Sequence, residues 1–300
     1  MIKVDISNVW GQISLPDLLA MEAEVAAAHN TLTEGTGAGN DFLGWLNLPV
    51  TEPTEEMVRI MDAAKNLKII VRAGAGYDNL DLAACSARGI VAENTPGQNS
   101  NAVAELALGL MIYMCRNQFN PGTGSEISGK TMGIQGFGNI GQLVAKKAVA
   151  LGMDVVIYTN EIKEKHQRWK ATFSLEHLYS SCDFVSVNIP ATPFTKGCVN
   201  YNLISKMPKG GCLINTARKE VVCEEGLEQA LSERPDLKYA TDIAPVAYAE
   251  LKEKYGKQIF ATPKKQGAET AEANMNAGLA AANQIVGYFA TGCTKFQVNK

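Results

Sequence analysis

The stretch "KTMGIQGFGNIGQLVAKKAVALGMDVVIYTN", residues 130–160, joins an apolar strand pattern, a glycine-rich turn, a helix pattern and a second strand pattern. In the turn, Gly136, Gly138 and Gly141 have the spacing G-x-G-x-x-G. Such a turn lets the backbone approach a pyrophosphate and packs the helix closely against the strand. The amide groups at the helix N-terminus then bind the phosphates. The stretch predicts a dinucleotide-binding unit, and the alternative is a glycine-rich turn without a ligand.

The second strand of this unit lacks the acidic residue that usually follows it. A carboxylate at that position accepts hydrogen bonds from the ribose hydroxyls of NAD, whereas here Thr159 is followed by an asparagine. Basic residues follow shortly afterwards: Lys163, Lys165, His166 and Arg168. Without the carboxylate, these basic residues could accept the 2′-phosphate of NADP, or they could form only a solvated helix face. We therefore expect NAD as the cofactor and leave NADP open.

Strand and helix patterns alternate along most of the chain. The strand-like segments are 68–74, 89–94, 130–136, 154–159, 183–189, 211–216 and 239–244. Alternation of this kind is typical of an α/β fold with parallel sheets and helices on both faces. The apolar segment 99–117 predicts a long buried helix, which serves either as core or as an interface.

Composition excludes several classes of protein. The chain has 300 residues, of which 46% are hydrophobic and 20% charged, with a net charge of -3. This predicts two globular lobes and no nucleic-acid partner. The longest apolar run, 106–115, is too short to span a membrane, and the first residues lack a signal-peptide pattern. The seven cysteines form no C-x-x-C motif, so we expect free thiols, no metal site and a cytoplasmic protein.

Four segments in order resemble the D-isomer-specific 2-hydroxyacid dehydrogenases. They are "RAGAGYDNLDL" (72–82), "NTPGQNSNAVAELALG" (94–109), the glycine loop and "MPKGGCLINTARKEVVCEEGLEQAL" (207–231). Within that family the chain is most similar to the short D-3-phosphoglycerate dehydrogenases. The resemblance implies two Rossmann-like or flavodoxin-like lobes with parallel sheets and an interlobe cleft. Residues 1–95 plus 270–300 would bind the substrate, and residues 96–269 would bind the dinucleotide.

The resemblance also implies roles for individual residues. Arg218 in "NTARKE" matches the catalytic arginine, which binds the substrate carboxylate and polarises the carbonyl group. A guanidinium suits this task because it makes two parallel hydrogen bonds to a carboxylate. The turn that matches the family's carboxylate-binding backbone contains Arg72, Ala73, Gly74 and Ala75. The expected cofactor contacts are Gly136, Gly138, Asn139, Ile140, Gly141, Thr159, Thr216, Ala217 and Asp242.

The chain departs from the family at the proton-transferring residues. Most members use a histidine paired with a glutamate, but Ala247 stands at the glutamate position and Lys264-Lys265 at the histidine position. Alignment on the following glycine favours Lys265, and alignment on the preceding proline favours Lys264. A lysine has one kind of nitrogen and needs no carboxylate to fix a tautomer. We expect Lys265 to transfer the proton, with Glu269 either positioning it or facing solvent.

The first sixty residues do not follow the family pattern. No arginine occurs between residues 1 and 58, although an arginine for the substrate phosphate would be expected there. Residues 34–49, "EGTGAGNDFLGWLNLP", instead resemble the N-terminal part of bacterial glucose-6-phosphate isomerases. The segment predicts a mosaic or strongly diverged substrate lobe.

These observations predict an NAD(P)-dependent oxidoreductase that acts on a small 2-hydroxy or 2-keto acid. The resemblance implies D-3-phosphoglycerate as the substrate, in serine biosynthesis, and a homodimer. A glyoxylate or hydroxypyruvate reductase is the alternative within the same chemistry. A dinucleotide-binding sensor or corepressor without turnover is the alternative from another class, because both usual proton-transferring residues are absent.

Overall fold

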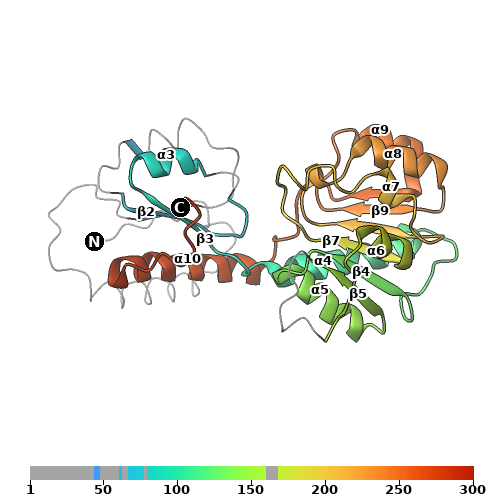
Figure 1. Cartoon of the computed structure of the whole chain (residues 1–300), viewed down its shortest axis with the longest axis horizontal. Coiled ribbons are helices and arrows are strands. Elements are labelled where there is room, and N and C mark those ends of the chain that lie inside the picture. The colour runs from blue at the N-terminus through green and yellow to red at the C-terminus, as the bar shows by residue number, and fades with distance from the viewer. Residues whose placement is uncertain (1–43, 48–60, 63–66, 78–79, 160–167) are drawn as a thin grey trace. The chain divides into compact units, whose positions relative to one another are not determined.

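The chain divides into two compact units that we describe separately. The computed structural model describes residues 44–47, 61–62, 67–77, 80–159 and 168–300. The central unit comprises residues 100–269, and the split unit comprises residues 1–99 together with 270–300. Both units are built on parallel β-sheets with helices packed against them (Figure 1). The predicted α/β class with parallel sheets is therefore confirmed.

The central unit has a seven-stranded sheet in the order β10-β9-β8-β7-β4-β5-β6. Every pair of neighbouring strands is parallel. The strands are β4 (Thr131–Gln135), β5 (Asp154–Tyr158), β6 (Lys170–Ala171), β7 (Phe184–Val187), β8 (Cys212–Asn215), β9 (Lys238–Thr241) and β10 (Ile259–Ala261). The strand order reverses beside β4, and α/β folds bind ligands at such a switch point.

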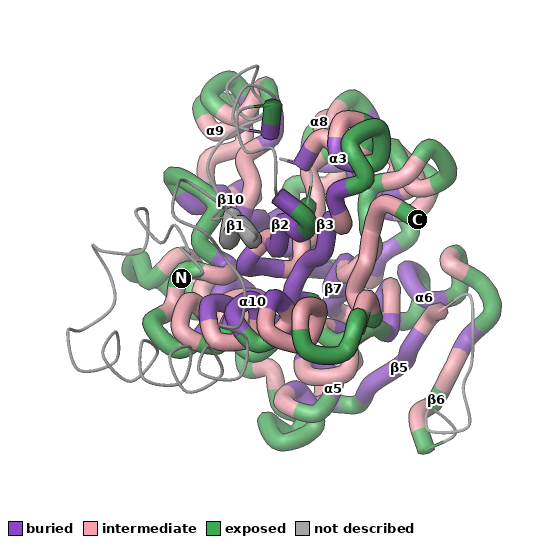
Figure 2. Tube along the Cα trace, turned by 90° about the vertical axis from the view of Figure 1, so that its left-hand side faces the viewer, coloured by how far each residue is buried: buried purple, intermediate pink, exposed green. Residues whose placement is uncertain are grey.

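Helices cover both faces of this sheet. One face packs against α4 (Ser100–Cys115) and α5 (Asn139–Ala150), the other against α6 (Leu175–Ser181), α7 (Tyr201–Ile204), α8 (Glu224–Glu233) and α9 (Tyr248–Tyr255). The described residues of this unit also include the short 3-10 turns η1 (Asn117–Phe119), η3 (Lys219–Val221) and η4 (Gly256–Gln258). Alternate strand residues serve the two cores: Ile157 packs with the α4 and α5 side and Val156 with the other. The strands are accordingly buried throughout their middle (Figure 2).

The split unit joins the two ends of the chain. Its parallel sheet has the order β1 (Gly44–Asn47), β2 (Ile69–Arg72) and β3 (Val91–Asn94), and α3 (Leu82–Ala87) begins at Asp81, whose carboxylate caps the helix. The C-terminal helix α10 (Ala271–Thr291) packs against β2 through a buried cluster of Ile69, Val71, Ala73, Ala277, Ala281 and Ile285. The Asn299 side chain then accepts the Ala92 N–H and donates to the Ile90 carbonyl, so the C-terminus is fastened to β3.

Strand β1 lies inside the stretch that resembles an isomerase, where no strand was predicted. Its backbone pairs with β2 in register from Gly44 with Ile69 to Asn47 with Arg72. The rest of residues 34–49 lies outside the described residues. Two other strands also escaped prediction, β6 and β10, which have 2 and 3 residues. Such short strands give no readable alternation.

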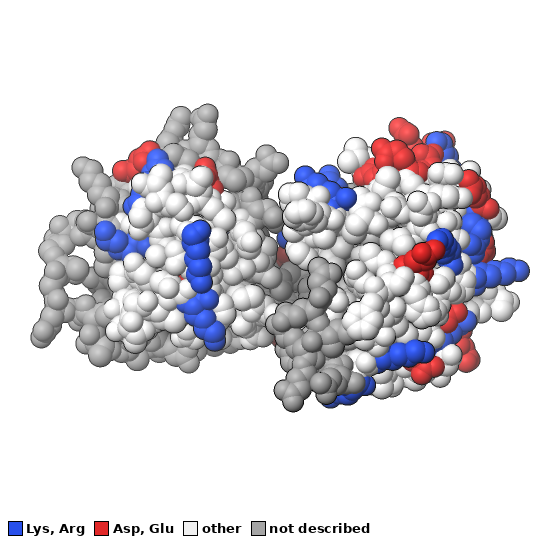
Figure 3. All heavy atoms as spheres, viewed as in Figure 1, with Lys and Arg blue, Asp and Glu red and all other residues white. Residues whose placement is uncertain are grey.

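Charged groups of both signs are mixed on the surface of the central unit. On the face shown in Figure 3 they lie interspersed, and several form exposed ion pairs, including Lys147 with Glu105 at 2.9 Å and Lys254 with Glu228 at 2.8 Å. All seven cysteines are free thiols, as expected. Within the described ranges, no helix is long and apolar enough to cross a membrane. The same residues contain no cluster of His, Cys, Asp or Glu suited to a metal ion.

Candidate active site

The glycine loop lies at the carboxyl end of β4, where the sheet changes direction. Gly136 has φ of 91°, and a Cβ atom there would lie 2.6 Å from the Asn188 carbonyl oxygen. A Cβ on Gly141 would clash with the Gly136 carbonyl oxygen, so the first turn of α5 packs directly on the loop. Gly138 caps α5 without a side-chain hydrogen bond and faces open space. The helix N-terminus is thus accessible to a phosphate group.

The backbone amides of Asn139 and Ile140 belong to the first turn of α5, where N–H groups have no partner within the helix. Gly138 and Asn139 are exposed and Ile140 is half-buried. The helix dipole also favours negative charge at this end. These residues therefore fit the pyrophosphate of a dinucleotide.

Two buried polar atoms at the same edge of the sheet support this fit. Asn188 follows β7 and Thr216 follows β8. Within the described part of the chain, neither Asn188 Oδ1 nor Thr216 Oγ1 has a hydrogen-bond partner. Buried polar atoms are normally paired, so such atoms indicate groups that bind a ligand or water. Asn188 was not predicted; a polar residue at the end of an apolar strand was the signal for it.

The ribose end of the predicted cofactor site is described only in part. Thr159 directly follows β5 and is half-buried, while Lys163, Lys165 and His166 lie outside the described residues. Arg168 is described, and its guanidinium lies 5.2 Å from the centre of the Trp169 ring. This contact is a cation–π interaction, which keeps Arg168 on the aromatic face.

Arg218 follows β8 and is held in a tight turn by its neighbours. Asn215, which is 1% exposed, accepts the Ala217 N–H at 3.0 Å and donates to the Arg218 carbonyl at 3.0 Å. The guanidinium is half-buried and donates to the Ala217 carbonyl at 3.0 Å. Asn215 is the first residue of the motif "NTARKE", but its hydrogen bonds to the Arg218 turn were not predicted from the sequence.

Lys264 and Lys265 lie on the loop that follows β10. The backbone of this loop is hydrogen-bonded to Asp242, which directly follows β9. The Asp242 carboxylate is 1% exposed and accepts the N–H groups of Gln266 and Gly267, both at 2.7 Å. The Thr262 hydroxyl lies 3.0 Å from the same carboxylate and 2.8 Å from the Lys264 carbonyl. The loop backbone is thereby fixed on both sides of Lys264 and Lys265, whose side chains are exposed.

This contact also explains the glycine after the lysines. A Cβ atom on Gly267 would lie 2.7 Å from Asp242 Oδ2, so the amide could not approach the carboxylate as closely. Glu269 is exposed, and its N–H donates to the Gln266 carbonyl at 2.9 Å. The family resemblance predicts that Asp242 lies near the nicotinamide, and the structure shows that its carboxylate supports the lysine loop.

A carboxylate does lie beside Ala247, but it comes from another helix. Glu224, at the start of α8, accepts the N–H groups of Val246 at 2.7 Å and Ala247 at 3.2 Å. Its oxygens therefore hold the start of α9, which begins after Ala247.

The predicted substrate turn lies in the split unit, at the end of β2. The Gly74 N–H donates to the Thr95 hydroxyl at 2.6 Å, and Asn94 donates to the Ala75 carbonyl at 2.7 Å. Arg72 folds its guanidinium back over Gly74, in the space that a Cβ would occupy. Ala73 is buried in the contact with α10. The turn is thus fixed by residues at the end of β3.

Comparison with known proteins identifies the family. Residues 111–263 match the model of the D-isomer specific 2-hydroxyacid dehydrogenase, NAD binding domain. Hydroxypyruvate reductase of Thermotoga maritima is 36% identical over 255 residues, which cover 79% of this chain and 83% of that protein. D-3-phosphoglycerate dehydrogenase of Haemophilus influenzae is 37% identical over 268 residues, 83% of this chain and 64% of that protein.

The chain spans only 48% of some other curated D-3-phosphoglycerate dehydrogenases. A solved structure, NAD+-bound 3-phosphoglycerate dehydrogenase of Entamoeba histolytica, is 39% identical, with a TM-score of 0.80 and coverage of 94% of both chains. The chain therefore belongs to the D-isomer specific 2-hydroxyacid dehydrogenases, a family of NAD-dependent oxidoreductases.

Proposed function

We propose that this enzyme interconverts D-3-phosphoglycerate and its 2-keto product, the oxidoreductase step of serine biosynthesis. The observation that carries the proposal is the 39% identity, over 94% of both chains, to a 3-phosphoglycerate dehydrogenase that binds NAD+. That similarity extends well beyond residues 111–263, which match the NAD binding domain. It therefore supports a shared substrate more strongly than a match confined to the cofactor site.

We assign cofactor binding and substrate binding to different domains. We assign the dinucleotide to residues 96–269 and the substrate to residues 1–95 with 270–300. The loop of Gly136, Gly138 and Gly141 would hold the pyrophosphate with the amides of Asn139 and Ile140. Thr216, Ala217 and Asp242 would flank the nicotinamide. When bound, the cofactor supplies or accepts the hydride.

The substrate carboxylate would be bound by Arg218 and by the amides of Ala73, Gly74 and Ala75, beside Arg72. A charged, bidentate guanidinium contact is stronger and more directional than a neutral hydrogen bond. The same guanidinium would polarise the carbonyl oxygen and stabilise the negative charge that develops on it during reduction. The half-buried position of Arg218 favours this role, because interactions between charges strengthen as water is excluded.

Lys265 would donate the proton that converts the reduced carbonyl oxygen to a hydroxyl group. An ammonium group is already protonated at neutral pH, so donation needs no shift in its pKa. The carboxylate of Asp242 fixes the backbone of the loop that carries Lys265. The loop is therefore held without the glutamate that pairs with histidine elsewhere in the family, and Glu269 remains a candidate for positioning the lysine side chain.

A reductase of unphosphorylated 2-keto acids is the second candidate. It is favoured by the similarity to hydroxypyruvate reductase, of which the chain covers 83%. We further propose a homodimer formed through α4, whose Leu106, Ile112 and Tyr113 remain partly exposed, and a cytoplasmic location.

The test is the initial rate of NADH and NADPH oxidation with phosphohydroxypyruvate and with hydroxypyruvate. A higher kcat/KM for the phosphorylated acid supports the serine-pathway function. A higher value for hydroxypyruvate supports the second candidate. Cofactor binding without a rate for either acid would contradict both and favour a dinucleotide-binding sensor. The ratio of NADH to NADPH rates tests the expected use of NAD at Thr159.

A further inference from the structure

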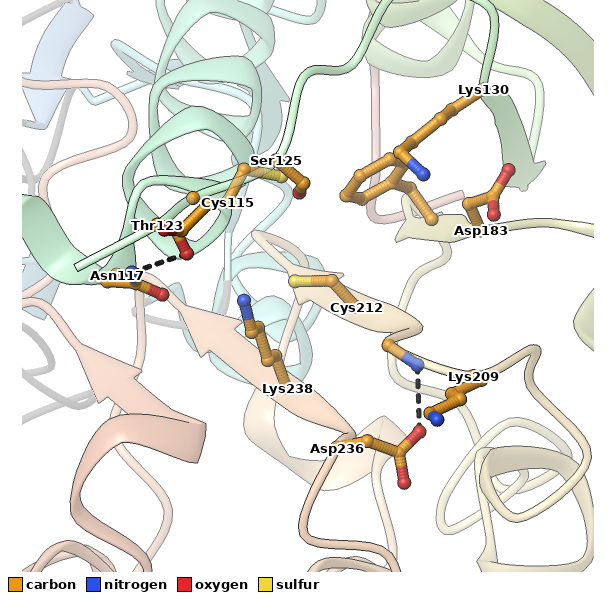
Figure 4. Close-up of a pocket in the computed structure, with 13 residues that line it drawn as sticks. Cys115, Asn117, Thr123, Ser125, Lys130, Asp183, Lys209, Cys212, Asp236 and Lys238 are labelled. Atoms are coloured by element: carbon orange, nitrogen blue, oxygen red, sulfur yellow. Dashed lines mark hydrogen bonds between the residues drawn. The ribbon is translucent and has the colours of Figure 1, made fainter.

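The central unit contains a cavity on the opposite edge of its sheet from the glycine loop. The cavity has a volume of about 320 Å³. It lies at the amino ends of the parallel strands, because Lys130 directly precedes β4, Asp183 precedes β7, Cys212 begins β8 and Lys238 begins β9. The loop after α4, with Asn117 and residues 123–125, closes one side. We call it the amino-edge pocket (Figure 4).

Three lysines give this pocket an excess of positive charge. In the view of Figure 4, Lys130, Lys209 and Lys238 surround Cys212 from three sides. Lys238 is fixed, since its ammonium donates to the Met114 carbonyl at 3.0 Å. In the described part of the chain, neither Lys130 nor Lys209 forms an ion pair. Like charges gathered in a concave site attract an anion.

In the described part of the chain, neither aspartate of the pocket forms an ion pair with Lys130 or Lys209. Asp183 accepts the Thr131 N–H at 2.9 Å. Asp236 forms two hydrogen bonds with Arg234, at 2.9 and 2.7 Å, and accepts the Gly210 N–H at 2.7 Å. The bonds from Arg234 hold the pKa of the Asp236 carboxyl well below its usual range. Lys130 and Lys209 thus remain available for a ligand.

The wall formed by the loop after α4 is conformationally strained. Asn117, Gln118 and Phe119 have φ values of 55°, 57° and 57°, in the left-handed region. Each such residue costs about 1 kcal/mol or more unless it is glycine. The Gln118 amide stabilises the turn by donating to the carbonyls of Lys257 and Ile259, at 3.1 and 3.3 Å. Asn117 Nδ2 donates to the Thr123 carbonyl and holds the wall in place. Strain of this kind is concentrated at functional sites.

We propose that the amino-edge pocket binds a small phosphate-bearing anion, either inorganic phosphate or a phosphate monoester. Lysines that approach from several elements suit a tetrahedral phosphate, whose oxygens accept from many directions. No arginine is among the described residues that line the pocket, so an anion there would be bound by the point charges of the lysines. The hydroxyls of Thr123 and Ser125 are further possible donors. The volume of about 320 Å³ lies at the lower end of the range for small-molecule sites, which is about 300–1,000 Å³.

Isothermal titration calorimetry at constant ionic strength tests the proposal. The protein is first saturated with NAD, so that the N-terminus of α5 is occupied, and then titrated with inorganic phosphate or glycerol 2-phosphate. The parent is compared with the double variant Lys130→Gln/Lys209→Gln. The control, Lys206→Gln/Lys254→Gln, removes the same charge from exposed pairs with Glu176 and Glu228. We expect the first double variant to bind at least about tenfold more weakly and the control to match the parent.

Equal affinities of the parent and the Lys130→Gln/Lys209→Gln variant would overturn the proposal, as would malonate binding as tightly as phosphate. Tighter binding of inorganic phosphate than of glycerol 2-phosphate would identify the free anion as the ligand, and the reverse would identify a monoester. A second measurement does not depend on variants. Crystals of the NAD complex soaked in tungstate should show anomalous density between Lys130, Lys209 and Lys238, and density elsewhere alone would refute the site.

Discussion

The loops after β8 and β10 are each held by a buried side chain that forms hydrogen bonds with the loop backbone, but one side chain is neutral and the other is charged. The turn that carries Arg218 is braced by a neutral amide, Asn215, which both accepts and donates. The loop that carries Lys265 is braced by a carboxylate, Asp242, which can only accept. In each case the buried polar side chain lies at the end of a parallel strand, and the loop that it supports carries a charged residue.

The difference has a physical consequence for the two loops. An amide satisfies one N–H and one carbonyl and leaves no charge buried. A carboxylate accepts several N–H groups with stronger, charge-assisted bonds, but it needs all of them because a buried charge without partners is costly. The lysine loop should therefore be the more rigidly held of the two. Removing its support should lower the free energy of unfolding by more than removing the support of the Arg218 turn.

The largest effect is expected at the charged residue of the first loop. Arg218→Ala should lower kcat/KM about a thousandfold, because it removes both a carboxylate contact and charge stabilisation in the transition state. Arg218→Lys restores the charge without the planar fork and should recover only part of the loss. Steady-state kinetics measure the effect, with NADH binding by fluorescence as the control. A loss of less than about tenfold would remove Arg218 from the chemistry.

The second loop offers two neighbouring lysines as matched variants. Lys265→Ala should lower kcat about a hundredfold, the usual range for loss of a general acid, with cofactor affinity unchanged. Lys264→Ala should retain most of the activity, because the alignment on Gly267 assigns the proton to Lys265. Single-turnover measurement of NADH oxidation compares the two directly. The opposite result, a large loss only in Lys264→Ala, would exchange their roles, and equal turnover in Lys265→Ala and the parent would reject the assignment.

The contact between Asp242 and the lysine loop can be weakened by a substitution on either side of it. Asp242→Asn removes the charge but leaves one acceptor oxygen, and we expect a loss of about 1–3 kcal/mol in the free energy of unfolding and about tenfold in kcat. Gly267→Ala should have a similar effect, since its methyl group would lie 2.7 Å from Asp242 Oδ2. Urea denaturation and steady-state kinetics measure both changes. Gly287 lies within α10, where an added methyl group would be 3.9 Å from the Cys293 Cβ, an ordinary contact, and it provides a glycine-to-alanine control.

If Asp242→Asn and Gly267→Ala leave both the stability and kcat unchanged, the carboxylate does not position the lysines. A stable protein with a lowered kcat would instead assign the contact to catalysis alone.

The sequence predicted the framework of these loops better than their supports. The strand ends and the long helix α4 follow from apolar patterns of sufficient length, and the glycine spacing predicted the loop before α5. Asn215 was within reach of prediction, because its partners are only 2 and 3 residues away. The Asp242 contact was not, since it joins residues 25 positions apart through a strand pairing that the sequence does not specify.

The amino-edge pocket lay beyond prediction for the same reason. Lys130, Lys209 and Lys238 lie in separate segments of the sequence, and each has the features of an ordinary surface lysine. They come together only because parallel strands align their amino ends in the order β9-β8-β7-β4. A cluster of this kind depends on topology rather than on any local motif.

The smallest effect is expected at the neutral brace, Asn215. Asn215→Ala should lower kcat/KM several-fold and the free energy of unfolding by about 1–2 kcal/mol, since it leaves the Ala217 N–H and the Arg218 carbonyl without their partner. Asn215→Asp sharpens the comparison with Asp242, because it places a carboxylate where one acceptor and one donor are needed. One oxygen can still accept the Ala217 N–H, while the other faces the Arg218 carbonyl.

Because position 215 is 1% exposed and the second oxygen must donate, the folded state should raise the pKa of the Asn215→Asp carboxyl above the ordinary value of about 3.9. The protonated acid can donate to the Arg218 carbonyl, so its contribution to stability is complete below the unfolded pKa and is lost as the pH rises through the folded pKa. Urea denaturation from pH 4 upward should therefore show Asn215→Asp losing stability relative to Asn215→Ala as the pH increases. A pH-independent difference would mean that the turn tolerates a charged acceptor as the lysine loop does, and the contrast between the two loops would then lie in their catalytic residues alone.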